Sequence, residues 1–176
     1  PKSESLVLGD GNTIANVIVK IKSGLPPNAK YAPPTNSAEL DQIGCIYIPH
    51  VLVAQVGQTV KFKNSDTALH NVHTLSEKNP AFNKAVNKGG EIARTYDQEE
   101  IFLVKCDIHP WMKNYVSVVS HPFFSITKSD GKFEIKNLPA GKYTVEVWHE
   151  RLGEKTQEVE VSDGQSAGRD FTLSKS

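Results

Sequence analysis

The chain has 176 residues, with 20 Lys and Arg balanced by 20 Asp and Glu, and 38% of its residues are hydrophobic. This length suits one β-rich domain or two small ones, and the zero net charge gives no electrostatic basis for binding nucleic acid or an anionic membrane. No apolar run approaches the roughly 20 residues that a bilayer span needs. We therefore expect a globular protein with no nucleic-acid partner and no membrane span. Because the chain begins Pro-Lys-Ser-Glu, without an initiator Met or an apolar leader, we also expect a mature or trimmed form.

Strand signals dominate the first two thirds of the chain. β-Branched and apolar runs bounded by Gly, Pro and Asn predict strands at 14–22, 45–48, 51–55, 59–63, 68–74, 100–106 and 115–120. Residues 23–42 carry four Pro and are predicted to form an ordered loop or insertion. No segment has a helical period of 3.6 over 12 or more residues, so the fold class is all-β.

The last third has its own rhythm of short strands and tight turns. Strands are expected at 123–127, 132–136, 142–148, 158–161 and 170–173, with Asp-Gly turns between some of them. The stretch GKFEIKNLPAGKYTVEV resembles the transthyretin-like β-sandwich of carboxypeptidase regulatory-like domains. We predict a boundary near 120–122, which divides the chain into a domain at 1–120 and a β unit at 121–176.

The chemistry-bearing residues gather in one short loop. Cys106-Asp-Ile-His109-Pro-Trp-Met112 places a thiolate, an imidazole and a thioether within seven residues, where an expected strand ends. A fourth ligand must come from elsewhere, and the segment that contains His70 and His73 supplies candidates. One Cys, two His and a weak axial Met form the ligand set of a mononuclear blue-copper site. The alternative is a buried Cys, a surface His in a turn and a core Met.

The loop Cys-x-x-His-Pro-x-Met, together with Phe62-Lys-Asn64 and His70-Asn-Val-His73, resembles the cupredoxins, most closely their amicyanin- and plastocyanin-like members. The resemblance extends over roughly 44–120 and includes PHVLVAQVG, which is similar to the strand before the first ligand. It implies that 1–120 forms a Greek-key β-sandwich with the Pro-rich insertion 23–42. It also implies one copper ion per chain, with four ligands: His70, Cys106, His109 and Met112.

The same resemblance separates the two histidines of the first segment and indicates a function. His70 is the implied ligand, and His73 faces the other way because residues three apart on a strand point to opposite sides. The implied function is type 1 copper electron transfer between a donor and an acceptor redox protein, without catalysis, in the periplasm or otherwise exported. His109 would be the electron port, with Ile108, Pro110 and Trp111 as its docking rim, although Trp111 fits core packing equally well.

Several residues remain outside this scheme. Cys45, with His50 and either His149 or His121, would extend or neighbour the metal site if it were not an ordinary buried thiol. A purple dinuclear copper centre uses two Cys, two His and one Met, but it normally takes both Cys from one loop. Asn64 or Asn71 would hydrogen-bond around the thiolate loop, and Asn71 is favoured because it adjoins the ligand.

Two other functions remain open at this point. The first is a copper oxidoreductase or multi-copper centre that uses Cys45 and His50 as further ligands. The second is a β-sandwich binding module with an accessory copper site. Metal stoichiometry distinguishes the first from an electron carrier, and partner binding by the chain from Ser120 onward would favour the second.

Overall fold

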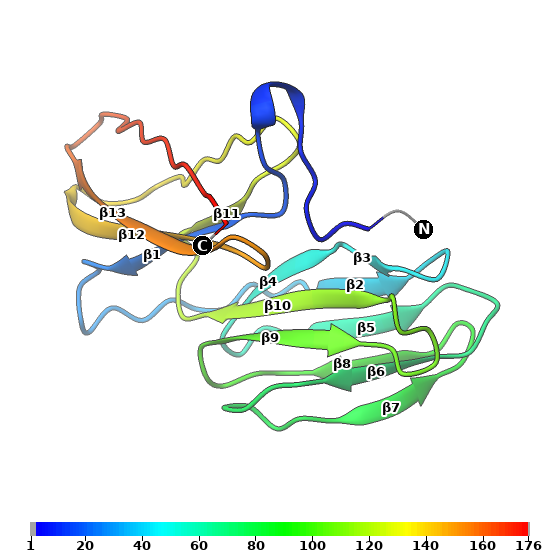
Figure 1. Ribbon diagram of the computed structural model, residues 1–176. Helices are drawn as coiled ribbons and strands as arrows, with labels where there is room; N and C mark the ends of the chain where they lie inside the picture. The colour runs from blue at the N-terminus through cyan, green and yellow to red at the C-terminus, as the bar shows by residue number, and fades with distance from the viewer. Residues whose placement is uncertain (1–2, 176) are drawn as a thin grey trace. The chain divides into compact units, whose positions relative to one another are not determined.

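The structure is a computed structural model, and it describes residues 3–175. Its contacts divide the chain into two compact units, one formed by 31–122 and the other by 3–30 together with the chain from Phe123 onward. Apart from a short 3₁₀ turn at Asp10–Asn12, the regular elements described are all strands (Figure 1). The all-β fold class is therefore confirmed. Within the described residues no helix is long and apolar enough for a membrane crossing.

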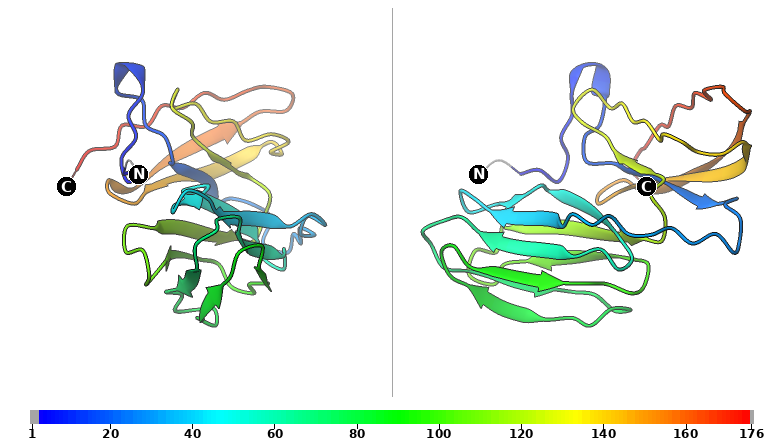
Figure 2. Two further views of the ribbon diagram at one scale, coloured as in Figure 1. Left: turned by 90° about the vertical axis from the view of Figure 1, so that its right-hand side faces the viewer. Right: turned by 180° about the vertical axis from the view of Figure 1, so that it is seen from behind.

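The first unit is a sandwich of two sheets (Figures 1 and 2). One sheet has the order β4-β10-β9-β6-β7, with bounds Val51–Gln55, Lys113–Val119, Glu100–Lys105, His70–Thr74 and Asn83–Val86. The other has the order β3-β2-β5-β8, with bounds Tyr47–Ile48, Ala38–Gln42, Val60–Asn64 and Glu91–Arg94. The β4–β10 and β2–β5 pairs are parallel, so long connections join strands that are neighbours in space.

Alternation of apolar and polar residues explains how these sheets pack. In β5 the side chains of Val60, Phe62 and Asn64 are buried, whereas the intervening lysines are partly exposed. The inward faces of both sheets contribute to one core, which includes Leu40, Phe62, Val72, Val104 and Val116. Cys106 and Met112 belong to the same core. The candidate metal loop is thus attached directly to the hydrophobic core of the unit.

The strand register brings the two candidate ligand segments together. β6 and β9 are antiparallel, with His73 opposite Lys105 and Thr74 opposite Val104. Continued past the end of β9, this register places His70 opposite the loop that follows Lys105. β10 then starts at Lys113, paired with Lys105, so the residues between these two lysines form a connection at that end of the sheet.

The second unit is a four-stranded antiparallel sheet with the order β11-β1-β12-β13. The bounds are Phe124–Ile126, Ile18–Ser23, Gly141–His149 and Gly153–Val161. β1 lies between two strands from the far end of the sequence, where Ile18, Val19 and Ile21 are buried. Contacts divide the chain at 122 and assign residues 3–30 to the second unit, whereas the sequence analysis expects a domain at 1–120 and a β unit at 121–176.

Three further sequence expectations differ from the structure. The Pro-rich segment 23–42 was expected to be loop throughout, but its end forms β2, since Leu40 and Gln42 are buried beside β5. The residues of the expected strands at 132–136 and 170–173 have no regular secondary structure and lie outside the sheet. Side chains of β13 hold the second of these, because Gln157 Nε2 donates to Asp170 O at 2.8 Å. The ring centroids of Phe133 and Phe171 are 6.2 Å apart, so the two segments touch each other.

Candidate metal centre

His70 is the first residue of β6, and its side chain is fully buried. The turn between the end of β5 at Asn64 and the start of β6 positions His70. Asn64 fixes that turn, because its Oδ1 accepts from the Asp66 amide at 2.9 Å and its Nδ2 donates to Ala68 O and Val86 O. An Asn or Asp side chain that binds the backbone two residues onward is a common device for reversing the chain. The turn therefore fixes both Asp66 and the start of β6.

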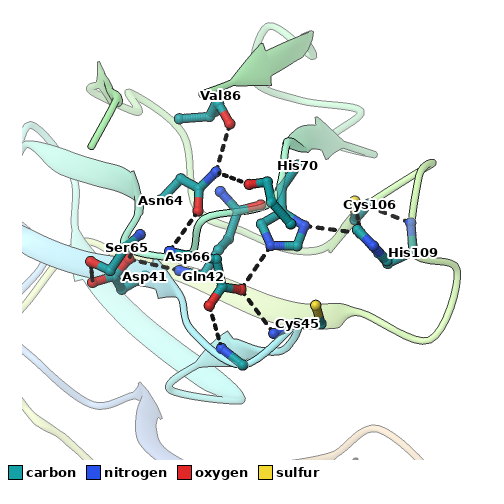
Figure 3. A network of polar contacts seen from close by, with 12 residues as sticks. Asp41, Gln42, Cys45, Asn64, Ser65, Asp66, His70, Val86, Cys106 and His109 are labelled. Atoms are coloured by element: carbon teal, nitrogen blue, oxygen red, sulfur yellow. Dashed lines mark hydrogen bonds and ion pairs between the residues drawn. The ribbon is translucent and has the colours of Figure 1, made fainter. Parts of the chain in front are cut away.

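Asp66 determines which nitrogen of His70 is available for a metal. Its Oδ2 lies 2.8 Å from His70 Nε2 (Figure 3). A carboxylate only accepts hydrogen bonds, so Nε2 carries the proton and Nδ1 presents a lone pair. Burial raises the pKa of Asp66, but hydrogen bonds from the Cys45 amide, from His70 and from the Gly44 amide outweigh it and leave the pKa below its usual value. Asp66 therefore stays ionised and holds the His70 ring.

The loop from Cys106 to Met112 is closed by its own backbone. Cys106 N donates to Met112 O at 3.2 Å, and Met112 N donates to His109 O at 2.9 Å. His109 N also donates to Cys106 Sγ at 3.4 Å. These bonds place Cys106 and Met112 inside the core, each only 1% exposed, whereas His109 is half-buried.

Three possible ligand atoms surround one point. His70 Nδ1 lies 3.0 Å from His109 Nδ1, and Cys106 Sγ lies 4.0 Å from His109 Nδ1. Cys106, His70 and His109 form a group in which the ligand atoms all lie within 4.8 Å of one another. Two imidazole nitrogens and a sulfur at these spacings fit a copper ion with bonds of about 2 Å. Three of the four ligands inferred from the sequence are therefore brought together, and the fourth, buried Met112, lies in the same loop.

Asn71 connects the two ligand segments. Its Oδ1 accepts from the Asp107 amide at 2.6 Å, and Cys106 Sγ lies 3.2 Å from the same oxygen. Its Nδ2 donates to Asn83 Oδ1 and to Asp107 Oδ2. The structure thus places Asn71 beside the Cys106 sulfur, whereas Asn64 holds the turn before His70.

His73 contacts Asp107 and, within residues 3–175, belongs to no group of closely spaced ligand atoms. Its Nδ1 is 2.9 Å from Asp107 Oδ2, and Lys105 Nζ is 3.0 Å from the other oxygen of that carboxylate. The hydrogen bond from Lys105, with those from Asn83 and His73, holds the pKa of Asp107 far below its usual value despite the opposing effect of burial. His73 therefore belongs to a partly exposed network with Asp107 and Lys105.

Tyr47 joins the start of β6 to the end of β9. Its hydroxyl donates to Asn71 O at 2.7 Å and lies 3.1 Å from Lys105 O. Burial raises the pKa of the Tyr47 phenol well above its usual value, so the donor proton is retained. This bond fixes the two segments from which His70 and Cys106 project.

Apolar side chains lie exposed around His109. Ile108 is 47% exposed, Trp111 is 55% exposed and Pro110 is exposed. The Trp111 ring lies 5.3 Å from that of His109, and its Nε1 donates to Cys45 O at 2.9 Å. Core packing of Trp111, which the sequence also allowed, is wrong. The indole is a surface group tied to the turn that contains Cys45.

Of the further metal-ligand candidates from the sequence, Cys45 lies close to His70, whereas the three additional histidines do not join a group of ligand atoms among the described residues. Cys45 lies with Asp66 and His70 in a second group of closely spaced ligand atoms. Within residues 3–175 neither His50, His121 nor His149 belongs to such a group. His149 lies in the second unit, where its Nδ1 accepts from Arg151 N at 3.2 Å. Both cysteines are free thiols.

Besides Tyr47, whose hydroxyl joins the two ligand segments, the sequence analysis missed Asp66. A signal for it was present, since Asn64-Ser65-Asp66 predicts a turn and places a carboxylate four residues before His70. Nothing in the sequence indicates that this carboxylate folds back onto the imidazole.

One comparison with known proteins agrees with the resemblance seen in the last third of the sequence. Residues 115–174 match the model of the carboxypeptidase regulatory-like domain. That match begins inside β10 of the first unit and ends in the second. A comparison with curated proteins finds no match.

Similar solved structures include three copper proteins. A Cu-containing nitrite reductase from Thermus scotoductus is 24% identical, with a TM-score of 0.44 over 55% of this chain and 25% of that one. A purple cupredoxin from Nitrosopumilus maritimus is 24% identical, with a TM-score of 0.42 over 47% of this chain and 99% of that one. A Cu(I) amicyanin variant is 22% identical, with a TM-score of 0.44 over 57% of this chain and 97% of that one. Cupredoxins are thus among the proteins similar to this chain, and the match spans a quarter of the nitrite reductase.

Proposed function

We propose that this chain is a mononuclear type 1 copper protein that carries single electrons between a donor and an acceptor protein. The observation that supports this most directly is the convergence of His70 Nδ1, His109 Nδ1 and Cys106 Sγ, with Asp66 on the far nitrogen of His70. Thiolate, two imidazoles and an axial thioether are the donors of such a site. Bound copper would supply a one-electron Cu(I)/Cu(II) couple.

The protein's own part is to hold these donors still. Cys106 and His109 are fixed by the closed loop, and His70 is fixed by Asp66. A rigid donor set suits electron transfer, because little rearrangement is then needed when the charge on the metal changes. Burial of Cys106, Met112 and His70 excludes water from the donor atoms.

The electron route that we propose runs through His109. This residue is half-buried and lies among the exposed side chains of Ile108, Pro110 and Trp111. An apolar rim around a partly exposed ligand suits a partner that docks briefly, because small contacts without fixed ion pairs release readily. The periplasmic or exported location remains a prediction.

The test is to load the protein with Cu(II), count metal per chain, and record the visible absorption and electron paramagnetic resonance spectra. One copper with an intense blue band and a narrow four-line hyperfine pattern is expected. Cys106→Ser should abolish the band, whereas His73→Ala, the matched control, should retain it. An open coordination position, revealed by binding of an exogenous anion, would instead favour the oxidoreductase, and a colourless protein would contradict the proposal.

A further inference from the structure

The turn 43–46 brings a second sulfur to the His70 side chain. Ile43 and Ile46 close this turn with hydrogen bonds in both directions, N to O at 3.0 and 3.4 Å. The two central residues, Gly44 and Cys45, have φ angles of 65° and 57°. Their amides donate to the two oxygens of Asp66, at 2.6 Å from Gly44 and 2.8 Å from Cys45. Asp66 therefore fixes the position of Cys45 as well as that of His70 (Figure 3).

These residues form a second group of ligand atoms. Cys45 Sγ, a carboxylate oxygen of Asp66 and a ring nitrogen of His70 all lie within 4.8 Å of one another. The two nitrogens of His70 face different partners, since Nδ1 is directed at His109 and Nε2 at Asp66. The proposed copper site would use Nδ1, so Nε2 is the ring nitrogen that remains available for a second metal ion.

The donor types at this second group suit a particular class of cation. A thiolate, an imidazole and a carboxylate are the three ligand types that proteins use for Zn²⁺, and three protein ligands leave one position for water. Cys45 and Asp66 are partly exposed whereas His70 is fully buried, so solvent reaches the group from the side of Cys45 and Asp66. We propose that Cys45, Asp66 and His70 Nε2 bind a divalent cation of the zinc type, with the His70 ring shared between this site and the copper centre.

Binding requires a small rearrangement and the release of protons. Ligand atoms of a tetrahedral zinc site lie roughly 3.4 Å apart, as follows from bonds of about 2.0–2.3 Å. His70 Nε2 and Asp66 Oδ2 are now 2.8 Å apart, so they must separate by about half an ångström. The cation replaces the proton between them and the proton of the Cys45 thiol. In a protein without copper the ring keeps its proton by moving it to Nδ1, so only the thiol proton leaves.

Asp66 can serve this cation without releasing the turn. Each carboxylate oxygen has two lone pairs, and the amides of Gly44 and Cys45 use one on each oxygen. The oxygen near His70 therefore has a further lone pair for the cation once the proton has gone. The site forms without unfolding the turn.

Cobalt(II) in place of zinc tests the site apart from copper. The chain has two cysteines, so in the full-length Cys106→Ala protein, kept reduced, Cys45 is the remaining thiol. We expect about one Co²⁺ per chain, with a near-ultraviolet thiolate-to-cobalt charge-transfer band, and we expect Zn²⁺ to displace it. The band should be lost in Cys106→Ala/Cys45→Gly. Glycine adopts a φ of 57° without strain, so this control should fold. Absence of the band from Cys106→Ala, or its survival in the double variant, would overturn the proposal.

A second measurement tests the sharing of His70. Adding Zn²⁺ to the copper-loaded native chain should shift the copper absorption band and its hyperfine splitting, and Cys45→Gly should abolish both shifts. No shift, or a shift that survives in Cys45→Gly, would show that the ring is not shared. If the native chain binds no blue copper, the proposed function fails while the cobalt result still decides whether the second site exists.

Discussion

At the scale of single residues, Asp66 has the widest influence on the site. It holds the His70 ring by a hydrogen bond and the turn 43–46 by two more. Hydrogen-bonded partners of metal ligands commonly affect metal affinity by roughly 10–100-fold. The position of a carboxylate that is not itself a copper ligand thus determines how well the ligand is oriented.

Asp66→Ala should therefore weaken copper binding by roughly 10–100-fold, because His70 loses its fixed tautomer and orientation. Competition with a chelator of known affinity measures the change. Asp97→Ala, at an exposed carboxylate of the same unit, is the matched control and should bind copper as the native chain does. Equal affinity of the two variants would show that Asp66 does not position His70.

Met112 permits a different test of the donor set. Its side chain is 1% exposed and lies in the core with Cys106. Met112→Gln should retain blue copper but lower the reduction potential, because a harder oxygen donor favours Cu(II) over Cu(I). Voltammetry on the loaded protein measures this shift. A potential that is unchanged or raised would remove Met112 from the proposed ligand set.

At the scale of elements, the turn 43–46 carries a conformational cost at Cys45. A φ of 57° places a non-glycine side chain in the left-handed region, which costs roughly 1 kcal/mol. Cys45→Gly should raise the free energy of unfolding by about 0.5–1 kcal/mol, as measured by chemical denaturation. Cys45→Ala removes the same sulfur but keeps a Cβ, so it should not be stabilised. If both variants changed the free energy of unfolding equally, loss of the sulfur, and not relief of the backbone strain, would explain the change.

The β1–β12 pair contains an ion cluster that makes stability depend on pH. Glu146 on β12 is paired with Lys20 at 3.3 Å and with Lys22 at 2.5 Å. Burial raises the pKa of Glu146, but the hydrogen bond from Lys22 and the charges of both lysines outweigh it and lower the pKa below 4.5. The stabilisation is therefore fully present above pH 4.5 and is lost as pH falls through the lower, folded-state pKa.

Glu146→Gln should lower the stability of the second unit by roughly 1–2 kcal/mol at pH 7, because the lysines lose their counter-charge. The difference from the native chain should shrink as the pH is lowered below 4.5, since native Glu146 then becomes neutral too. Thermal unfolding from pH 3 to pH 7 measures this convergence. A constant difference across that range would contradict the role given to the carboxylate.

At the scale of the whole molecule, the second unit is discontinuous in sequence. The fragment 31–122 contains every proposed copper ligand and one complete unit, so we expect it to fold and bind copper alone. The fragment 121–176 lacks β1, which is hydrogen-bonded on both sides in the native sheet, and we expect it not to fold alone. Circular dichroism with thermal melting tests both, and adding a peptide of 3–30 should restore structure to the second. Cooperative melting of 121–176 alone would contradict this assignment.

The features that the sequence predicted are mainly local. Cys106, His109 and Met112 lie in one seven-residue loop, so their spacing already indicates a shared site, and period-two alternation predicted strands such as β5. Pairings between distant segments were not predictable in this way. Nothing near Ile18 shows that it pairs with Trp148, and nothing near Cys45 shows that its amide binds Asp66. Such contacts depend on packing of the whole chain.

Because β1 pairs with strands from the end of the sequence, it cannot join its sheet until most of the chain has been synthesised on the ribosome. Ile21 pairs with Val145, so about 120 residues must be translated after β1 before β12 exists. At roughly 5–20 residues per second, this delay lasts on the order of ten seconds, and the unit with the proposed copper ligands emerges complete in the meantime. During that interval the apolar side chains of Ile18, Val19 and Ile21 lack the strands that bury them. Until the last third of the chain is synthesised, the nascent chain therefore exposes an apolar segment at 18–21 that can bind other apolar surfaces.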